Sequence, residues 1–210
     1  MTDDEYLQAE REARAESVKY FGVANKPERE KWVAQTFLVN LGITYNTTEL
    51  VAGEDPPDVQ LRDASFEIKE ILDPDRRRHQ EYKDSLEEAK RATTPRDLVR
   101  PAPFNEIAIA KVYELVLQNT DELSKTKYAL ALRRKLDLLF YVNLLNVYEF
   151  IEVPFPNVFA LSSLGWRSVS FVKGHRSCVL TVADDAPSFF RNNIGRVVHR
   201  KVEDEAASNL

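Results

Sequence analysis

Two acidic residues followed by a lysine form the part of the sequence with the clearest capacity for chemistry. Asp58 follows two prolines, and the triplet Glu67-Ile68-Lys69 comes after eight intervening residues. In an extended strand, side chains two residues apart lie on the same face. Glu67 and Lys69 therefore point together, while Phe66 and Ile68 face the core. On a strand, this triplet can contribute a carboxylate and an ammonium group to one site.

The position of Asp58 relative to the triplet follows from two short strands, which we expect at Val59–Leu61 and Ala64–Ile71. A turn at Arg62-Asp63 would fold the first strand back beside the second and bring Asp58 close to the triplet. A second Glu-x-Lys triplet, Glu81-Tyr82-Lys83, lies in a stretch of helical character. Because residues two apart do not face each other on a helix, only the first triplet is expected to build a site.

The chemistry that these residues suit is divalent-cation binding. The carboxylates of Asp58 and Glu67 and the main-chain carbonyl of Ile68 form a set of hard oxygen ligands for Mg²⁺ or Mn²⁺. Beside such an ion, Lys69 can orient a water molecule or offset charge on a phosphate during hydrolysis. Two plainer interpretations stay open. Asp58 is a common turn residue after proline, and Glu67 and Lys69 can form an ordinary ion pair on an exposed strand.

The elements that must position these residues are inferred from periodicity and from the residues that end helices. We expect a charged helix over the first 23 residues, ended by Gly22, and a second helix at Pro27–Leu41, ended by Gly42. Besides the two short strands, the pattern predicts a strand at Ile43–Leu50, a polar helix at Arg76–Ala92, an apolar helix at Asn105–Gln118 and a buried strand at Leu136–Leu145. A β-rich tail follows, with strands at Phe150–Val153, Val169–Val172 and Cys178–Val182 and a short helix at Pro187–Asn193. The order predicts an α/β fold with a mixed sheet.

Composition excludes several classes of protein. The 210 residues are 43% hydrophobic and 10% aromatic, which argues against disorder. One cysteine excludes an internal disulfide, three histidines make a zinc cluster implausible, and no apolar run reaches a membrane span. The net charge of −5 gives no overall case for nucleic acid, but residues 43–75 hold nine acidic side chains against two basic ones. We expect a cytoplasmic protein with no membrane partner.

Together, Pro57-Asp58 and Glu67-Ile68-Lys69 resemble the PD-(D/E)XK signature of restriction-endonuclease-like nucleases. The core of that superfamily runs helix, three strands, helix and strand, which matches the order expected between residues 27 and 145. The resemblance implies a restriction-endonuclease-like αβββαβ core in a single domain, 1–210, with an N-terminal helical extension at 1–26 and a β-rich C-terminal extension at 146–210. The run Asp-Pro-Asp-Arg-Arg-Arg after the motif is also similar to a small uncharacterised bacterial family labelled putative endonucleases, a label that itself rests on the motif.

The resemblance implies a metal-dependent nuclease whose catalytic residues are Asp58, Glu67, Lys69 and Glu30. Asp58, Glu67 and the Ile68 carbonyl would bind Mg²⁺ or Mn²⁺. Glu30 would be an outer or additional ligand, because many members carry a glutamate early in the first core helix.

The expected partner is nucleic acid, DNA rather than RNA, with Arg76, Arg77 and Arg78 contacting the phosphate backbone. The solvated start of a helix is an equal alternative for these arginines. A homodimer is also expected, because many relatives of this fold act as dimers and the aromatic C-terminal part could supply an interface. Trp32 and Trp166 are expected in the core or an interface rather than as platforms for base stacking. Two other functions stay open: a catalytically silent member of the fold that binds nucleic acid or a protein, and an interaction module with fortuitous carboxylates.

Overall fold

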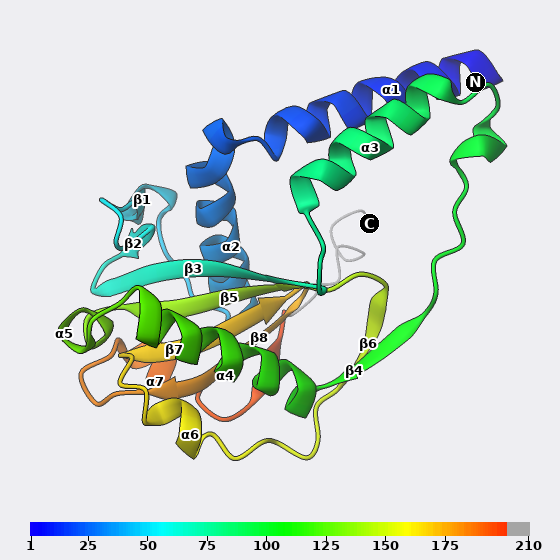
Figure 1. Ribbon diagram of the computed structural model, residues 1–210. Helices are drawn as coiled ribbons and strands as arrows, with labels where there is room; N and C mark the ends of the chain where they lie inside the picture. Colours follow the sequence, from blue (N-terminus) through cyan, green and yellow to red (C-terminus); the bar gives the residue numbers. More distant parts are fainter. Residues whose placement is uncertain (201–210) are drawn as a thin grey trace, which may run out of the picture.

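A seven-stranded mixed sheet forms the centre of the fold in the computed structural model, which describes residues 1–200 (Figure 1). Its strands lie in the order β1-β2-β3-β5-β7-β8-β9. β3, β5 and β7 are parallel, whereas the other neighbouring pairs are antiparallel. The strands are β1 (Leu50–Ala52), β2 (Val59–Leu61), β3 (Ala64–Leu72), β5 (Asp137–Asn143), β7 (Ser168–Lys173), β8 (Arg176–Val182) and β9 (Val197–His199). The expected α/β fold with a mixed sheet is confirmed.

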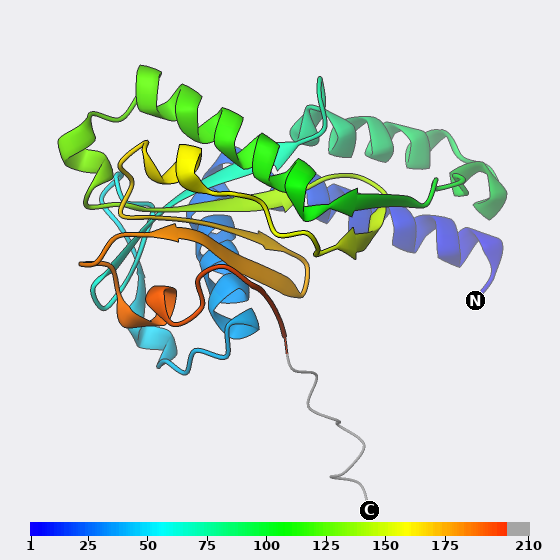
Figure 2. The same ribbon diagram turned by 90° about the horizontal axis from the view of Figure 1, so that it is seen from below.

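Helices cover both faces of this sheet, with α2 on one face and α4 on the other (Figure 2). The helices are α1 (Asp3–Tyr20), α2 (Lys26–Asn40), α3 (Arg78–Arg91) and α4 (Ile109–Thr126), with single turns at α5 (Leu130–Arg133), α6 (Phe159–Ser162) and α7 (Ser188–Arg191). Along β3, Phe66 and Ile68 pack with the apolar side chains of α2. Glu67 faces the opposite side, where it contacts Tyr128 just beyond α4. The alternation expected for this strand is present.

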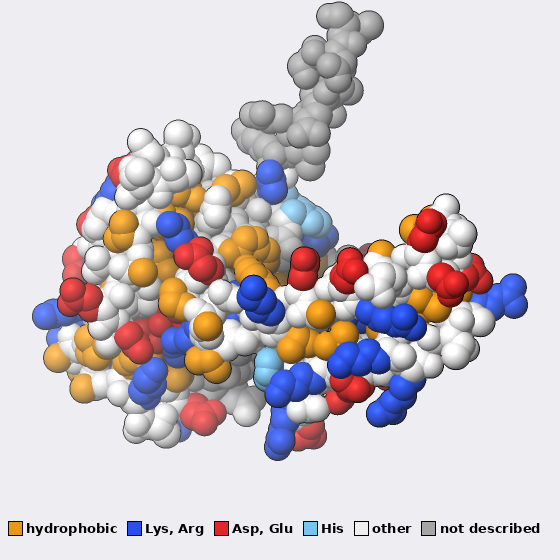
Figure 3. Space-filling model, turned by 90° about the horizontal axis from the view of Figure 1, so that it is seen from above, with side chains coloured by type: hydrophobic (Ala, Val, Ile, Leu, Met, Phe, Trp, Pro, Cys, Tyr) orange, Lys and Arg blue, Asp and Glu red, His pale blue; other side chains and the backbone are white. Residues whose placement is uncertain are grey.

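Helices α1 and α3 lie side by side and extend away from the sheet (Figures 1 and 3). Two arginines of α1 hold the pair together. Arg11 donates to the carbonyl oxygens of Ala89 and Ala92 at 3.0 and 3.1 Å, and Arg14 donates to the carbonyl oxygen of Ser85 at 3.0 Å. Because carbonyls in the last turn of a helix lack partners within that helix, the guanidinium of Arg11 stabilises the end of α3.

The strand expected at Ile43–Leu50 is wrong over most of its length. A 3-10 turn, η2 (Thr47–Glu49), occupies the second half, and β1 begins only at Leu50. The side chain of Asn46 accepts from the backbone N–H of Thr48, and the side chain of Glu49 accepts from the backbone N–H of Asn46. These local hydrogen bonds compete with strand pairing. The strand propensities of the residue types do not include them.

The helix expected at Asn105–Gln118 begins later and ends later. Its first four residues form β4 (Asn105–Ala108), which pairs in parallel with β6 (Val147–Ile151) in a separate two-stranded sheet. The apolar run Ile107–Ile109 fits either a strand or a helix, and pairing with β6 decides the outcome. The other expected elements are present with bounds shifted by a few residues, and two further 3-10 turns occur at η1 (Val23–Asn25) and η3 (Pro95–Leu98).

The C-terminal part continues the main sheet through β7, β8 and β9. Phe150, Trp166 and Phe171 are only 7%, 6% and 0% exposed and belong to the core, whereas Phe159, another aromatic side chain of this part, is 77% exposed. Trp32, expected in the core or an interface, is 45% exposed. The last ten residues of the expected extension lie outside the described residues. Within residues 1–200, no helix combines the length and apolar character needed to cross a membrane.

Candidate metal centre

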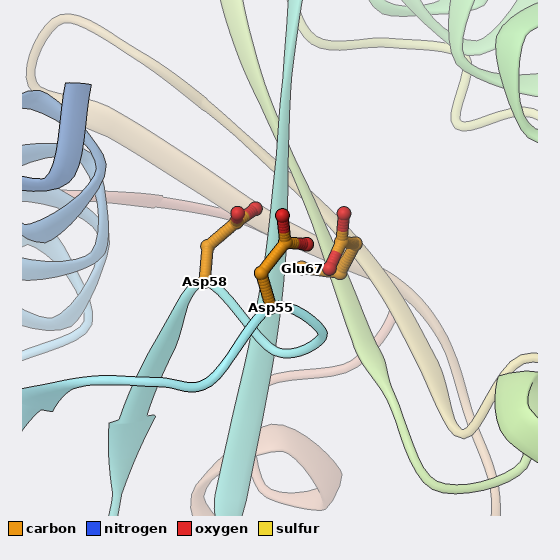
Figure 4. Close-up of side chains that lie close together, drawn as sticks. All are labelled: Asp55, Asp58 and Glu67. Atoms are coloured by element: carbon orange, nitrogen blue, oxygen red, sulfur yellow. The ribbon is translucent and has the colours of Figure 1, made fainter.

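Three carboxylates meet at the start of β2 and the middle of β3. Asp55, Asp58 and Glu67 each offer an oxygen, and these oxygens all lie within 4.8 Å of one another. Figure 4 shows Asp55 on the loop before β2, Asp58 at the start of that strand and Glu67 on β3, with their carboxyl groups close together. The antiparallel pairing of β2 with β3 brings Asp58 and Glu67 to one place, as the short turn between the strands predicts.

The loop that carries Asp55 is folded tightly against the start of β2. The N–H of Gly53 donates to the carbonyl of Asp58 at 2.9 Å, and the N–H of Asp58 donates to the carbonyl of Phe66 at 2.9 Å. A side chain at position 53 would place its Cβ 2.0 Å from the carbonyl oxygen of Pro57, which is closer than atoms can approach. Glycine is therefore required there, and it lets the loop bring Asp55 over the other two carboxylates.

Asp58 is held by β3 on one side and by α2 on the other. Its Oδ2 accepts from the N–H of Ile68 at 2.8 Å, and its Oδ1 lies 3.5 Å from Nζ of Lys26. Lys26 also contacts Glu30, one turn along α2, at 3.0 Å. The hydrogen bond to Glu30 raises the pKa of Lys26, whereas burial raises the pKa of Glu30 because it disfavours the charged carboxylate.

Glu67 is the most deeply buried member of the cluster, with no exposed surface. Its Oε1 accepts from the hydroxyl of Tyr128 and from Nζ of Lys69, and Nζ of Lys127 lies 3.9 Å away. Burial, followed by the hydrogen bond to Glu67, raises the pKa of Tyr128, so its hydroxyl stays protonated and donates. The other carboxylate oxygen of Glu67, Oε2, is buried and has no hydrogen-bond partner among the described residues.

This donor set fits a hard divalent cation. Three carboxylates supply oxygen ligands, and the unpartnered Oε2 of Glu67 is a buried acceptor that a cation would satisfy. Without a cation, the nearby charge is offset by lysines: Nζ of Lys69 contacts Glu67, lies 3.7 Å from Oδ2 of Asp58 and donates to the carbonyl of Ile68 at 2.9 Å. The group can therefore hold a cation, or hold an ammonium group in the same place.

The residues selected from the sequence fall into two groups. Asp58, Glu67, Ile68 and Lys69 lie together, and Glu30 is joined to them through Lys26. The three arginines after β3 do not converge on this site. Arg76 pairs with Glu81 at 2.8 Å, Arg78 pairs with Glu70, and Arg77 is exposed at the start of α3.

Four contributors escaped sequence reasoning, namely Asp55, Lys26, Lys127 and Tyr128. Two of them carried a local signal: Asp55 lies three residues before Asp58, and Lys26 is four residues before Glu30 on one helix face. Lys127 and Tyr128 carried none, because they are about 60 positions from Glu67 and reach it only through the crossover from α4 to β5.

The fold and the site define a mixed α/β protein with two buried carboxylates, Asp58 and Glu67, beside an exposed Asp55 and several lysines. Residues 2–205 match the model of the family described as "Putative endonuclease, protein of unknown function (DUF1780)", and the chain belongs to this family. It is also similar to a solved structure from Pseudomonas aeruginosa strain PAO1, described as "Protein of Unknown Function PA4535, Monooxygenase Superfamily". That similarity has a TM-score of 0.66 at 26% identity and covers 96% of this chain and 98% of the other. No curated protein matches the chain.

Proposed function

We propose that this protein is a nuclease that uses Mg²⁺ or Mn²⁺ to hydrolyse phosphodiester bonds of DNA or RNA. The observation that carries the proposal is the buried Glu67, whose Oε2 has no partner among the described residues although Asp55 and Asp58 lie beside it. Burying a carboxylate with an unsatisfied oxygen is costly, and a divalent cation would remove that cost.

In this proposal Asp58 and Glu67 hold the ion, with the Ile68 carbonyl as a third ligand. Asp55 is close enough to serve as a further ligand, and Glu30 contributes from α2 in an outer position. When bound, the metal lowers the pKa of a coordinated water and offsets charge on the phosphate. Lys69 orients the attacking water or stabilises the phosphate, since its ammonium group already lies between Asp58 and Glu67.

Three further observations support a nuclease. The elements run helix α2, strands β1 to β3, helix α4 and strand β5, which is the order of the restriction-endonuclease-like core. The family description also names an endonuclease, although by label alone. A hard, all-carboxylate donor set is moreover the type that Mg²⁺ and Mn²⁺ take.

A catalytically silent protein is the second candidate, and the position of Lys69 favours it. Its ammonium group contacts both Glu67 and the Ile68 carbonyl, where a metal would otherwise bind. In that case the fold binds nucleic acid or a protein partner without cleaving it.

A cleavage assay separates the two candidates. Labelled single- and double-stranded DNA and RNA are incubated with Mg²⁺, Mn²⁺ or EDTA and with wild type, Asp58→Asn, Lys69→Met or Lys83→Met. Lys83 is the matched control, because it belongs to the other Glu-x-Lys triplet and is exposed on α3. We expect metal-dependent cleavage by wild type and Lys83→Met, and a loss of at least about a hundredfold in the other two variants. Wild type that cuts no substrate, or cleavage that survives both site substitutions, contradicts the proposal.

A further inference from the structure

A pocket of about 350 Å³ lies where α1, α2 and α3 approach the end of β5. Its size is within the range of small-molecule and cofactor sites. The side chains that line it are mainly aromatic rings and guanidinium groups, among them Tyr20, Phe21, Arg29, Trp32, Arg78 and Tyr141. None of these residues is needed for the metal centre, and their chemistry is of another kind.

The aromatic part of the pocket combines a rigid stack with exposed rings. Phe21 and Tyr82 are parallel, with ring centroids 4.2 Å apart, and the guanidinium of Arg78 lies 4.0 Å from the centroid of Phe21. Trp32 and Tyr20, in contrast, are 45% and 42% exposed. Large aromatic rings that stay exposed beside a fixed stack offer a surface for another planar ring.

Two of the three arginines that line the pocket, Arg29 and Arg78, retain hydrogen-bonding capacity for an anion. Arg29 donates to the main-chain carbonyls of Tyr20 and Gly22 at 2.8 and 2.7 Å, and within residues 1–200 its positive charge has no carboxylate partner. Arg78 pairs with Glu70, but its Nε is buried and has no hydrogen-bond partner among the described residues. A phosphate oxygen is the usual acceptor for such guanidinium donors.

The pocket and the metal centre both border helix α2. Arg29 lines the pocket, and the following residue, Glu30, contacts Lys26, which lies 3.5 Å from Asp58. Figure 3 shows Lys and Arg side chains interspersed with Asp and Glu side chains along the α1 and α3 pair that leads away from this junction. A role for both in one nuclease requires one nucleic acid strand to reach both the metal centre and the aromatic rings of the pocket.

We propose that this pocket binds an unpaired nucleobase, with the adjoining phosphate at Arg29 and Arg78. The inference rests on the proposed nuclease function and narrows its substrate to single-stranded or locally unpaired nucleic acid. Stacking on an aromatic ring requires a base whose face is accessible, which a paired base in a duplex does not provide. Because every base has such a face, the pocket selects strandedness rather than sequence.

The test measures binding in EDTA, so that it does not depend on cleavage. Fluorescence anisotropy of labelled 12-nucleotide single-stranded DNA, single-stranded RNA and duplex DNA is recorded with wild type and with Trp32→Ala, Trp32→Phe and Tyr148→Ala. Trp32→Phe keeps a stacking ring. Tyr148 is the matched control, because it is 58% exposed and lies on β6, outside the pocket. Melting curves of all variants verify folding.

We expect Trp32→Ala to bind single strands about tenfold more weakly, with Trp32→Phe and Tyr148→Ala within about twofold of wild type and with weak duplex binding unchanged. Comparing DNA with RNA shows which sugar is preferred, and either preference supports the inference. Single-strand affinity unaffected by Trp32→Ala, or reduced equally by Tyr148→Ala, overturns it.

Wild type that binds single strands through Trp32 but cuts nothing with Mg²⁺ or Mn²⁺ refutes the nuclease while supporting the pocket. Metal-dependent cleavage by wild type, together with a single-strand affinity that does not depend on Trp32, supports the nuclease and refutes the pocket.

Discussion

Glu67 is the most deeply buried carboxylate of the candidate metal centre. A fully buried carboxylate is costly unless its oxygens are satisfied, and here Oε1 has partners in Tyr128 and Lys69 while Oε2 has none among the described residues. The two oxygens therefore have different roles: one fixes the orientation of the side chain, and the other is available to a ligand. Asp58 shows a similar division, since the N–H of Ile68 fixes Oδ2 while Lys26 lies near Oδ1.

Replacement of Tyr128 by phenylalanine tests the fixed oxygen of Glu67. The substitution removes one hydrogen bond to a buried charge, so we expect the free energy of unfolding in EDTA to fall by about 2 kcal/mol. Urea denaturation monitored by circular dichroism measures it. Tyr148→Phe serves as the control, because Tyr148 is 58% exposed, and its expected change is under about 0.5 kcal/mol. Equal stability of the two variants would show that Tyr128 does not support Glu67.

At the scale of elements, the site depends on the nine-residue strand β3 and on two segments beside it, the loop before β2 and the start of α2. β3 lies between β2 and β5 in the sheet, so its register with these strands fixes where Glu67 and Lys69 lie along the sheet. The loop before β2 adds Asp55 and Asp58, and the first two turns of α2 add Lys26 and Glu30. The loop is the most sensitive of these parts, because it is held by contacts that leave no room at Gly53.

Gly53→Ala is therefore expected to displace the loop and to weaken cation binding more than folding. A ligand that binds only the folded state raises the melting temperature, so the increase caused by Mn²⁺ reports on the site. We expect Gly53→Ala to lose most of this increase. Gly174→Ala is the control, because Gly174 has a φ of +55° but open space around it, and alanine there adds backbone strain of about 1 kcal/mol far from the carboxylates. Loss of the Mn²⁺ effect in both variants, or in neither, contradicts this account of the loop.

The sequence allowed some of these elements to be predicted and concealed others. The strand-turn-strand of β2 and β3 could be predicted because Phe66 and Ile68 alternate with polar residues and a polar turn separates two apolar runs. The strand expected before Leu50 failed because Asn46 and Glu49 make local hydrogen bonds that propensity does not count. Lys127 and Tyr128 reach the site through tertiary packing, for which a single sequence carries little signal.

On the scale of the whole molecule, two apolar cores lie on the two faces of the sheet and hold the site between them. One core joins α2 to Phe66 and Leu139, and the other joins α4 to Leu138 and Phe140. The charged groups thus sit at a rigid position, while the pair of α1 and α3 extends from the sheet and carries both acidic and basic side chains (Figure 3). The proposed division of labour places cation binding on the sheet and contact with the nucleic acid on the helices.

Cys178 provides a reporter of this packing. It is fully buried, and burial raises the pKa of its thiol to about 12 from about 9. Between these values the unfolded chain loses the thiol proton while the folded protein keeps it, so stability falls as the pH rises above 9. From pH 8 to pH 10, wild type should lose about 1 kcal/mol more than Cys178→Ala does, measured by urea denaturation. Identical pH dependence of the two proteins would mean that the thiol is not buried as described.

The central claim is that Asp58 and Glu67 bind a divalent cation together, and the anomalous scattering of Mn²⁺ in crystals soaked with the ion tests it most directly. The account predicts one strong peak within about 2.5 Å of a carboxylate oxygen of each residue, on the side of Oε2 of Glu67, with Lys69 moved away from the ion. The same soak of Asp58→Asn should give no peak there. A wild-type crystal without a peak at this place, while Lys69 stays in contact with Glu67, would contradict the claim.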